Sequence, residues 1–406
     1  MNAKTIPASL TGASVATAVS PRGLEPKSAP ACLRAADLKA LHPAFTPDSA
    51  SKFGCGRYRQ EEHLLERCAE EILRFGRHPL FVCDETSRAI AYDKVAASLG
   101  AEGIAPRVLV HGGFCCFDEA LERAADGTLD GIDVVLGCGG GVVIDFAKCL
   151  ADLASVPVVT MPTSSATCCA YTPIAPCYTR GGQYVATALF RREVAAALLD
   201  MTILSRQPAR LLLAGVCDAM AKKIEIEFWN SLPGSKGNAV ATGIAELVSD
   251  SIYAILDHEA DAAVADLARG EPTRTLNEVV FASVVGAGVV SGISGGERQT
   301  ALAHRFYFFS RLRWPEKATR RTHGELVAIG LVMQLAYYGR TREAEAFAAR
   351  LRGWGLPASV GDLGVPVDPA DVEACMGYLA ATSEMKAAGP EAVPRLRKAL
   401  EAIWIG

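Results

Sequence analysis

Short apolar runs alternate with amphipathic segments along residues 79–162, and this alternation constrains the fold more than any other feature. Four runs have the length and composition of buried strands: "PLFVCDE", "PRVLVHGG", "GIDVVLGCGGG" and "VPVVTMPTS". Three segments between them have helical periodicity: "SRAIAYDKVAASLGAEG", "CFDEALERAADG" and "VVIDFAKCLADLAS". This order predicts βαβ units and a parallel sheet. Just before it, "EEHLLERCAEEILRFG" predicts a helix that ends at Gly76.

Beyond about residue 205 the strand signals fade and long helical periodicities follow, as in "PARLLLAGVCDAMAKKIEIEFWN" and "HGELVAIGLVMQLAYYG". We therefore expect an α/β domain over residues 46–205 and an all-helical domain over residues 206–406. Residues 1–45 are rich in Ala, Ser, Thr and Pro, and we expect a disordered extension there rather than a transit peptide. Ligands usually bind in a cleft between two such halves.

Composition argues against several partners. The 41 basic and 45 acidic residues give a net charge of −4 without a dense basic block, which argues against nucleic acid or an anionic membrane as a partner. Gly, Ser or charged residues interrupt the apolar runs, so we expect no transmembrane helix. The 13 cysteines form no CxxC pair and indicate buried thiols in a reducing cytoplasm.

A glycine-rich turn joins the third strand to its helix in "VVLGCGGGVVIDFAK". Gly139, Gly140 and Gly141 would let a ligand approach the backbone, and the free N–H groups at a helix start favour a phosphate. A tight turn that merely needs glycine explains the pattern equally well. One turn along the helix, Asp145 lies among apolar residues with Lys148 nearby, and donors from a dinucleotide would offset its burial.

Asp84 ends the first of these strands, in "FVCDE". An acid at such a position can hold the 2′-hydroxyl of an adenosine ribose and repels a 2′-phosphate, which favours NAD over NADP. An ordinary helix N-cap is the competing interpretation.

Three candidate metal ligands lie in the helical half. His304 in "ALAHRF" and His323 in "RRTHGELVAIG" are separated by Trp314-Pro315, so they belong to different helices or to a helix and its lead-in. Asp218 lies in the apolar stretch "LLLAGVCDAMAKK", where an unpaired carboxylate is costly. One Asp and two His suit a divalent metal with an open position. Each residue alone also fits a satisfied core position.

Adjacent cysteines, Cys168 and Cys169, lie in "PTSSATCCAYTP". A disulfide between sequence neighbours would be strained, and no nearby His or cation in the sequence would lower a thiol pKa. We therefore expect neither a disulfide nor a catalytic thiol.

These stretches together resemble the iron-containing alcohol dehydrogenase superfamily, in its glycerol dehydrogenase-like branch. "GCGGGVVIDFAK" is similar to that family's GGGxxxDxxK phosphate turn. "VPVVTMPTSSATCCAYTPIAPCYTRGGQY" is similar to its PTxxST segment, which a short hairpin follows. "LLLAGVCDAMAK", "ALAH" and "HGELVAIG" are similar to its three metal-ligand motifs, in order.

The resemblance implies a nucleotide-binding α/β domain with a parallel sheet, followed by an all-α metal-binding domain, as in the dehydroquinate synthase-like fold. It implies a homo-oligomer and Asp218, His304 and His323 as metal ligands. The positions it implies for dinucleotide contact are Gly139, Gly140, Gly141, Asp145, Lys148, Thr163, Thr172, Ile174 and Tyr178.

Positions at which this sequence departs from the family pattern indicate which branch of the family it resembles most. Lys222 stands where iron-type members have a fourth ligand, a His, so the resemblance favours zinc over iron. Cys168 stands where glycerol dehydrogenases carry an acid thought to hold the polyol, and "ATCCAYTP" is similar to the loop of hydroxycarboxylate dehydrogenases. The lost negative charge suits an anionic substrate. Tyr307 replaces a second His and would alter the substrate pocket or the proton relay.

The resemblance thus implies hydride transfer between a nicotinamide cofactor and an alcohol or carbonyl, with a 2-hydroxy acid and 2-oxo acid as the favoured pair. Three alternatives stay open: a polyol dehydrogenase, a lyase of the dehydroquinate synthase type, and an inactive binding protein. Lys222 or Arg298 would suit a substrate carboxylate by charge, although a solvated surface charge is the simpler interpretation of each.

Overall fold

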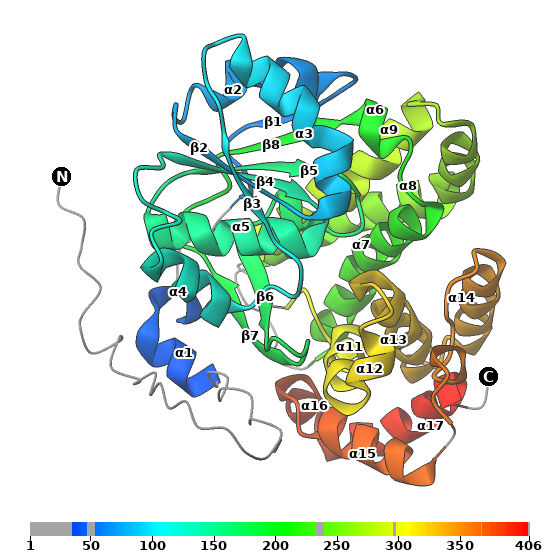
Figure 1. Cartoon of the computed structure of the whole chain (residues 1–406). Coiled ribbons are helices and arrows are strands. Elements are labelled where there is room, and N and C mark those ends of the chain that lie inside the picture. The colour runs from blue at the N-terminus through cyan, green and yellow to red at the C-terminus, as the bar shows by residue number, and fades with distance from the viewer. Residues whose placement is uncertain (1–34, 47–52, 233–238, 295–297, 367, 405–406) are drawn as a thin grey trace, which may run out of the picture. The chain divides into compact units, whose positions relative to one another are not determined.

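The computed structural model describes residues 35–46, 53–232, 239–294, 298–366 and 368–404 (Figure 1). Residues 1–34, most of the expected extension, lie outside the described residues. The end of that extension is structured, however. Helix α1 (Ala35–Leu41) and a 3-10 turn (Pro43–Phe45) precede the sheet, and Phe45 is buried in the α/β core against Phe117. Regular structure therefore begins earlier than the expected boundary at residue 46.

Six strands form one parallel sheet in the order β1-β8-β5-β4-β2-β3. The strands are β1 (Tyr58–Glu61), β2 (Pro79–Cys83), β3 (Arg107–Val110), β4 (Val134–Gly139), β5 (Val158–Pro162) and β8 (Ala196–Asp200). Every residue of β2, β4, β5 and β8 is buried, as expected for strands that helices cover on both faces. The predicted parallel α/β fold is confirmed.

Helices cover the two faces of this sheet (Figure 1). Helix α3 (Glu85–Gly100), with α2 (Ala69–Ile72), packs on one face, and α5 (Gly141–Ala154), with α4 (Phe117–Ala125), packs on the other. Alternation along β2 explains the two cores. Leu80 and Val82 join the core under α5, whereas Phe81 joins the core under α3.

Two details differ from the sequence prediction. Residues 61–76 do not form one helix, because β1 ends at Glu61 and a 3-10 turn (Leu64–Arg67) precedes the short α2. His63 adopts a left-handed backbone with φ of 55°, which interrupts any helix there. The sequence analysis did not predict strands β1 and β8. Their sequences, YRQE and AALLD, lack the alternation of β-branched and polar residues that is typical of strands.

All regular structure described after β8 is helical, as predicted. The segments are α6 (Met201–Leu204), α7 (Ala209–Asn230), α8 (Ala239–Arg269), α9 (Arg274–Phe281), a π-turn (Ala282–Gly286), α10 (Ala287–Ile293), α11 (Leu302–Arg313), α12 (Pro315–Ala318), α13 (His323–Tyr337), α14 (Thr341–Gly353), α15 (Pro369–Ala380), α16 (Ser383–Ala388) and α17 (Val393–Trp404). Before β8, an antiparallel hairpin of β6 (Ile174–Tyr178) and β7 (Tyr184–Leu189) leaves the main sheet, as the family resemblance implies.

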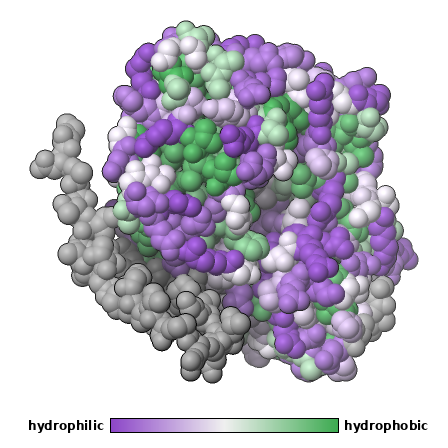
Figure 2. Space-filling view, viewed as in Figure 1, coloured by the Kyte–Doolittle hydropathy of each residue, from purple (hydrophilic) through white to green (hydrophobic). Residues whose placement is uncertain are grey.

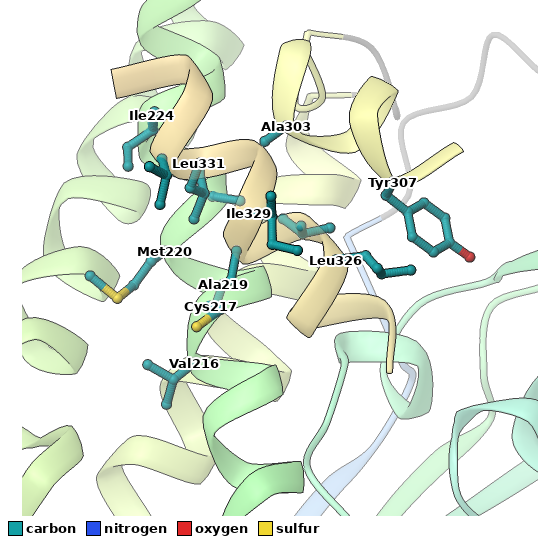
Figure 3. Close-up of a cluster of buried hydrophobic side chains, with 14 of the residues drawn as sticks. Val216, Cys217, Ala219, Met220, Ile224, Ala303, Tyr307, Leu326, Ile329 and Leu331 are labelled. Carbon is teal, nitrogen blue, oxygen red and sulfur yellow. The ribbon is translucent and has the colours of Figure 1, made fainter. Parts of the chain in front are cut away.

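Three helices of the second half pack without space for side chains at their crossings. A Cβ at Gly324 of α13 would lie 1.9 Å from the carbonyl oxygen of Ala214 on α7. A Cβ at Gly330 of α13 would lie 2.5 Å from the carbonyl oxygen of Ala303 on α11. Around these contacts, apolar side chains of α7, α11 and α13 form a continuous core (Figure 3). Glycine therefore sets the close spacing of the helices that carry the candidate metal ligands.

One helical stretch, Arg274–Ile293, is long and apolar enough to cross a membrane, contrary to the expectation that every apolar run is too short. Its best window is 67% buried inside the protein, which is also typical of a core helix. Polar side chains cover most of the face seen in Figure 2, and the apolar ones gather in patches, the largest of which lies over the α/β part.

Candidate active site

Several predicted cofactor positions lie at one edge of the sheet. Asp84 follows β2, the glycine turn ends β4, and Thr163 follows β5. These strands are neighbours and parallel, so their carboxyl ends share an edge. The chain continues from β2 to β3 on one side, whereas β4 lies on the other side of β2. Such a switch in strand order creates the crevice in which open α/β sheets bind ligands.

The glycines of the turn have different roles. A Cβ at Gly139, where φ is +156°, would lie 2.9 Å from Cβ of Val143, so this glycine permits close packing of α5. Gly140 and Gly141 have more room, because an added Cβ would meet nothing closer than 3.5 Å. Helix α5 also starts without a side-chain cap and without an acid in its first turn. Its first N–H groups are therefore suited to a phosphate of a dinucleotide.

Asp84 is the N-cap of α3, as the competing interpretation proposed. Its Oδ1 accepts a hydrogen bond from the N–H of Ser87 at 2.6 Å, and the Ser87 hydroxyl in turn accepts from the N–H of Asp84. The capping bond uses one carboxylate oxygen, and the residue lies beside the crevice between β2 and β4. Contact with a ribose stays a prediction.

Asp145 has a partner within its own helix. Nζ of Lys148 donates to Asp145 Oδ1 at 2.8 Å and to the carbonyl oxygens of Thr172 and Ile174 at 3.1 and 2.6 Å. The buried pair thus ties α5 to the start of the β6–β7 hairpin. Because Lys148 already offsets the charge of Asp145, this carboxylate does not depend on donors from a dinucleotide. Cofactor contacts by Asp145, Lys148, Thr172, Ile174 and Tyr178 stay predictions.

The three predicted metal ligands converge. Asp218 comes from the middle of α7, His304 from the first turn of α11, and His323 begins α13. The Nε2 atoms of His304 and His323 lie 3.3 Å apart, and each lies 3.3 Å from Oδ1 of Asp218. Residues that span 105 positions of the sequence, from Asp218 to His323, therefore share one site.

A fourth residue, the buried Glu225, orients this group, and the sequence analysis missed it. Oε2 of Glu225 lies 2.5 Å from Nδ1 of His304, and Oε1 accepts from the backbone N–H groups of Ala301 and His304. Burial by itself lowers the pKa of His304, but the carboxylates of Glu225 and Asp218 raise it to about 9. The spacing of Asp218, Lys222 and Glu225, at i, i+4 and i+7, puts three charged side chains on one face of an apolar helix and could have revealed Glu225.

These residues fit a divalent metal. Oδ1 of Asp218 is buried and makes no well-aligned hydrogen bond with a described residue, although Nε2 of His304 and of His323 each lie 3.3 Å away. Such an oxygen is costly to bury without a better partner. Tetrahedral coordination with bonds of about 2.0–2.1 Å separates neighbouring ligand atoms by about 3.4 Å, close to the three distances observed. Glu225 holds Nδ1 of His304 and leaves Nε2 for the metal, as carboxylates commonly do behind histidine ligands.

Comparison with known proteins agrees with the fold. Residues 55–200 match the model of the family described as iron-containing alcohol dehydrogenase. The chain is 28% identical to hydroxycarboxylate dehydrogenase A of Escherichia coli (strain K12), over 72% of this chain and 81% of that protein. It is 27% identical to a glycerol dehydrogenase of Thermotoga maritima, over 76% of this chain and 84% of that protein.

A crystal structure of a probable glycerol dehydrogenase from Sinorhizobium meliloti 1021 has the same fold, with a TM-score of 0.75 and 23% identity, over 88% of this chain and 98% of that one. The chain belongs to the iron-containing alcohol dehydrogenase family.

Lys222 lies one helical turn after Asp218, where the resemblance puts the fourth ligand of iron-type members. A charged ammonium has no lone pair for a metal, so a metal held by Asp218, His304 and His323 would have three protein ligands and an open position. Interpreting Lys222 as a solvated surface charge is wrong, because the residue is only 4% exposed. Arg298, the other candidate for a substrate carboxylate, is half-buried.

Tyr307 connects the hairpin to the metal ligands. Its hydroxyl hydrogen-bonds the hydroxyl of Tyr178 on β6, and its ring packs edge-on against His323 with centroids 4.2 Å apart. Burial raises the pKa of both phenols, so neither is suited to exchange a proton near neutral pH. An effect of Tyr307 on the substrate pocket or on a proton relay stays a prediction.

Cys168 and Cys169 are both free thiols, as expected. They begin a 3-10 turn (Cys168–Ala170) beside the glycine turn, since a Cβ at Gly141 would lie 3.5 Å from Sγ of Cys169. Burial raises the pKa of Cys168, and it raises that of Cys169 to about 12. Neither thiol is therefore activated as a nucleophile.

Three other cysteines form a cluster that the sequence analysis missed. Sγ atoms of Cys115, Cys149 and Cys177 lie within 4.8 Å of one another in the core beneath α5. They come from the loop before α4, from α5 and from β6, so no local motif joins them. All described cysteines are free and most are buried, which agrees with the expected buried thiols.

Proposed function

We propose that this chain is a metal-dependent, NAD(P)-linked oxidoreductase that interconverts a 2-hydroxy acid and a 2-oxo acid. The observation that carries the proposal is the buried, unsatisfied Oδ1 of Asp218, which faces Nε2 of both His304 and His323. Membership of an alcohol dehydrogenase family makes oxidoreduction at a CH–OH carbon the chemistry expected of such a site.

When bound, the divalent metal supplies a Lewis acid for the carbonyl oxygen, and the nicotinamide supplies or accepts the hydride. The residues of the chain position the metal ligand His304 and the hairpin beside the glycine turn. Glu225 orients His304, and Lys148 holds the hairpin against the helix that begins at the glycine turn. In oxidation the alcohol would give a hydride to the nicotinamide and a proton to water. Because burial keeps Tyr178 and Tyr307 protonated, these phenols would not take up that proton.

The choice of cofactor rests on Asp84. This carboxylate, at the carboxyl end of β2, favours a free 2′-hydroxyl over a 2′-phosphate, so we propose NAD, with NADP as the alternative. The donor set of one carboxylate and two imidazoles serves Zn²⁺ in sites with one open position and also Fe²⁺. Three ligands without a fourth His favour zinc.

The substrate class rests on charge. Cys168 leaves the loop beside the site without a carboxylate, and a 2-oxo acid is anionic, so no like charge opposes it there. The relative named hydroxycarboxylate dehydrogenase A supports this class. A polyol is the second candidate, because a glycerol dehydrogenase matches at nearly the same identity. A homo-oligomer in the cytoplasm stays a prediction.

A paired screen tests the proposal. The zinc-loaded protein is assayed with a panel of 2-oxo acids in the presence of NADH or NADPH, and with 2-hydroxy acids and polyols in the presence of NAD or NADP. We expect the highest kcat/KM for a 2-oxo acid with NADH. His304→Ala should abolish turnover, whereas His258→Ala, a change at an exposed histidine of α8, should not.

Other results would favour the alternatives. Preference for glycerol or another polyol would establish the polyol dehydrogenase. Substrate conversion without net change of the nucleotide would indicate a lyase of the dehydroquinate synthase type. Bound metal without any turnover would indicate an inactive binding protein.

A further inference from the structure

Lys222 is a buried cation that has no acidic partner among the described residues. Within that part of the chain its Nζ donates one hydrogen bond, to Oε1 of Gln299 at 2.9 Å. No carboxylate of the described residues lies within 4.0 Å of that nitrogen. Lys148, which is similarly buried, differs because it has Asp145 and two carbonyl oxygens. An ammonium can donate three hydrogen bonds, so Lys222 keeps donors for a ligand.

Lys222 lies on the side of α7 that carries Asp218. Lys222 follows Asp218 by one turn, and Gln299 lies in the segment before α11 that leads to His304. Burial raises the pKa of the Cys168 thiol, and Lys222 is the strongest charge that opposes this rise, which agrees with a place for both side chains in the same site.

The charges around this position leave an excess of positive charge. Asp218 and Glu225 contribute two negative charges, whereas Lys222 contributes one positive charge and a divalent metal would contribute two. With an acid at position 168, Lys222 would have a counter-charge, but Cys168 provides none at neutral pH. A buried ammonium without a counter-charge is costly, and a substrate anion would supply it.

We propose that Lys222, held by Gln299, is the subsite that binds the carboxylate of the substrate beside the metal ligands. The inference rests on the proposed function, because it assigns the anionic group of a 2-oxo acid to a particular cation of that same site. The carbonyl next to the carboxylate would then lie at the open metal position. Lys222 is thus a specificity-determining residue rather than a general acid.

A purely structural role for Lys222 is the competing explanation. Helix α7 also binds the same segment through Trp229, which donates to the carbonyl oxygen of Thr300, and through Glu225, which accepts from Ala301. Lys222 would then supply a third hydrogen bond that holds residues 299–301 against α7. Loss of such a structural bond should change the KM of every substrate equally, whereas loss of a carboxylate subsite should change only the KM of acids.

The test compares a 2-oxo acid with its uncharged methyl ester, using zinc-loaded wild type and Lys222→Gln. We expect Lys222→Gln to raise KM for the acid about 10- to 100-fold, because a charge-assisted hydrogen bond is lost. The KM for the ester should change less than about threefold. Lys223→Gln is the matched control, since Lys223 points to Asp250 on the surface and should leave both values unchanged.

Binding supplies a readout that needs no turnover. Calorimetry with oxamate, an unreactive analogue of a 2-oxo acid, should show a comparable loss of affinity in Lys222→Gln at equal zinc content. Should that variant lose zinc, Cys168→Asp provides the second test, because a carboxylate next to Lys222 should weaken oxamate binding without removing the lysine.

The outcomes separate the two proposals. Equal losses for acid and ester, or no loss for either, would overturn the role of Lys222 while leaving the proposed reaction intact. A wild type that does not prefer the acid to the ester would overturn the proposed substrate class, and with it this inference. A selective loss for the acid supports both.

Discussion

Glu225 holds His304 through both its ring and its backbone. Oε2 of Glu225 lies 2.5 Å from Nδ1 of the imidazole, and Oε1 accepts the backbone N–H at 2.9 Å. Glu225 is fully buried, so water does not compete for these bonds. The carboxylate therefore fixes the tautomer of His304 and leaves Nε2 facing Asp218 and His323.

Glu225→Gln should lower zinc affinity about 10- to 100-fold, because an amide offers one acceptor oxygen where the site uses two. Competition with a chelator measures this affinity. Glu227→Gln, two residues further on, removes a partner of Arg340 at the surface and serves as the control. Unchanged affinity in Glu225→Gln would show that Glu225 does not support the metal site.

Gly324→Ala should separate the start of α13 from α7, since the added Cβ would lie 1.9 Å from the carbonyl oxygen of Ala214. We expect a loss of about 1–3 kcal/mol in the free energy of unfolding, as for overpacked sites, together with weaker zinc binding. Urea unfolding of the zinc-free protein measures the first effect. Gly377→Ala in α15 has open space and should instead stabilise the protein by up to about 1 kcal/mol.

Cys168→Asp should shift preference from 2-oxo acids towards polyols, because it places a negative charge near the proposed carboxylate subsite and near Lys222. The ratio of kcat/KM for a 2-oxo acid to that for glycerol measures the shift. Cys168→Ser, which keeps the size and neutrality of the side chain, should keep the wild-type ratio. An unchanged profile in Cys168→Asp would contradict the role assigned to this loop.

Stability should depend on pH through Glu71, which pairs with Arg57 at 2.6 Å from its buried position on α2. The hydrogen bond with Arg57 lowers the pKa of Glu71 below its usual 4.5. Because the folded state binds this proton more weakly than the unfolded state, the contribution is present above pH 4.5 and is lost as pH falls through the lowered pKa.

The difference in unfolding free energy between wild type and Glu71→Gln should therefore shrink as the pH is lowered from 6 to about 3. Urea titrations at a series of pH values measure it. A difference that stays constant over this range would show that the ion pair does not contribute in the expected way.

Much of the fold follows from local sequence patterns. The strands and helices between residues 79 and 162 are predictable because each is long, periodic and bounded by glycine or by a capping residue such as Asp84. Strands β1 and β8 are not predictable in this way, because the two segments become strands through pairing with each other. The break at His63 depends on a single left-handed residue, which periodicity does not detect.

The site shows the same division. Asp218, His304 and His323 stand out as polar residues in apolar helices, but their convergence depends on contacts such as that of Gly324 with Ala214, which spacing does not reveal. The thiols of Cys115, Cys149 and Cys177 meet only because the hairpin folds back onto α5. Burial of Lys222 likewise results from tertiary packing.

The most direct test of the central claim is turnover of a 2-oxo acid by the purified protein with NADH, measured before and after removal and restoration of zinc. The account predicts that the protein oxidises NADH, that chelation abolishes this activity and that zinc restores it. The Asp218→Asn variant should show no such activity at the same zinc concentration. Turnover that persists at full rate without any divalent metal would contradict it.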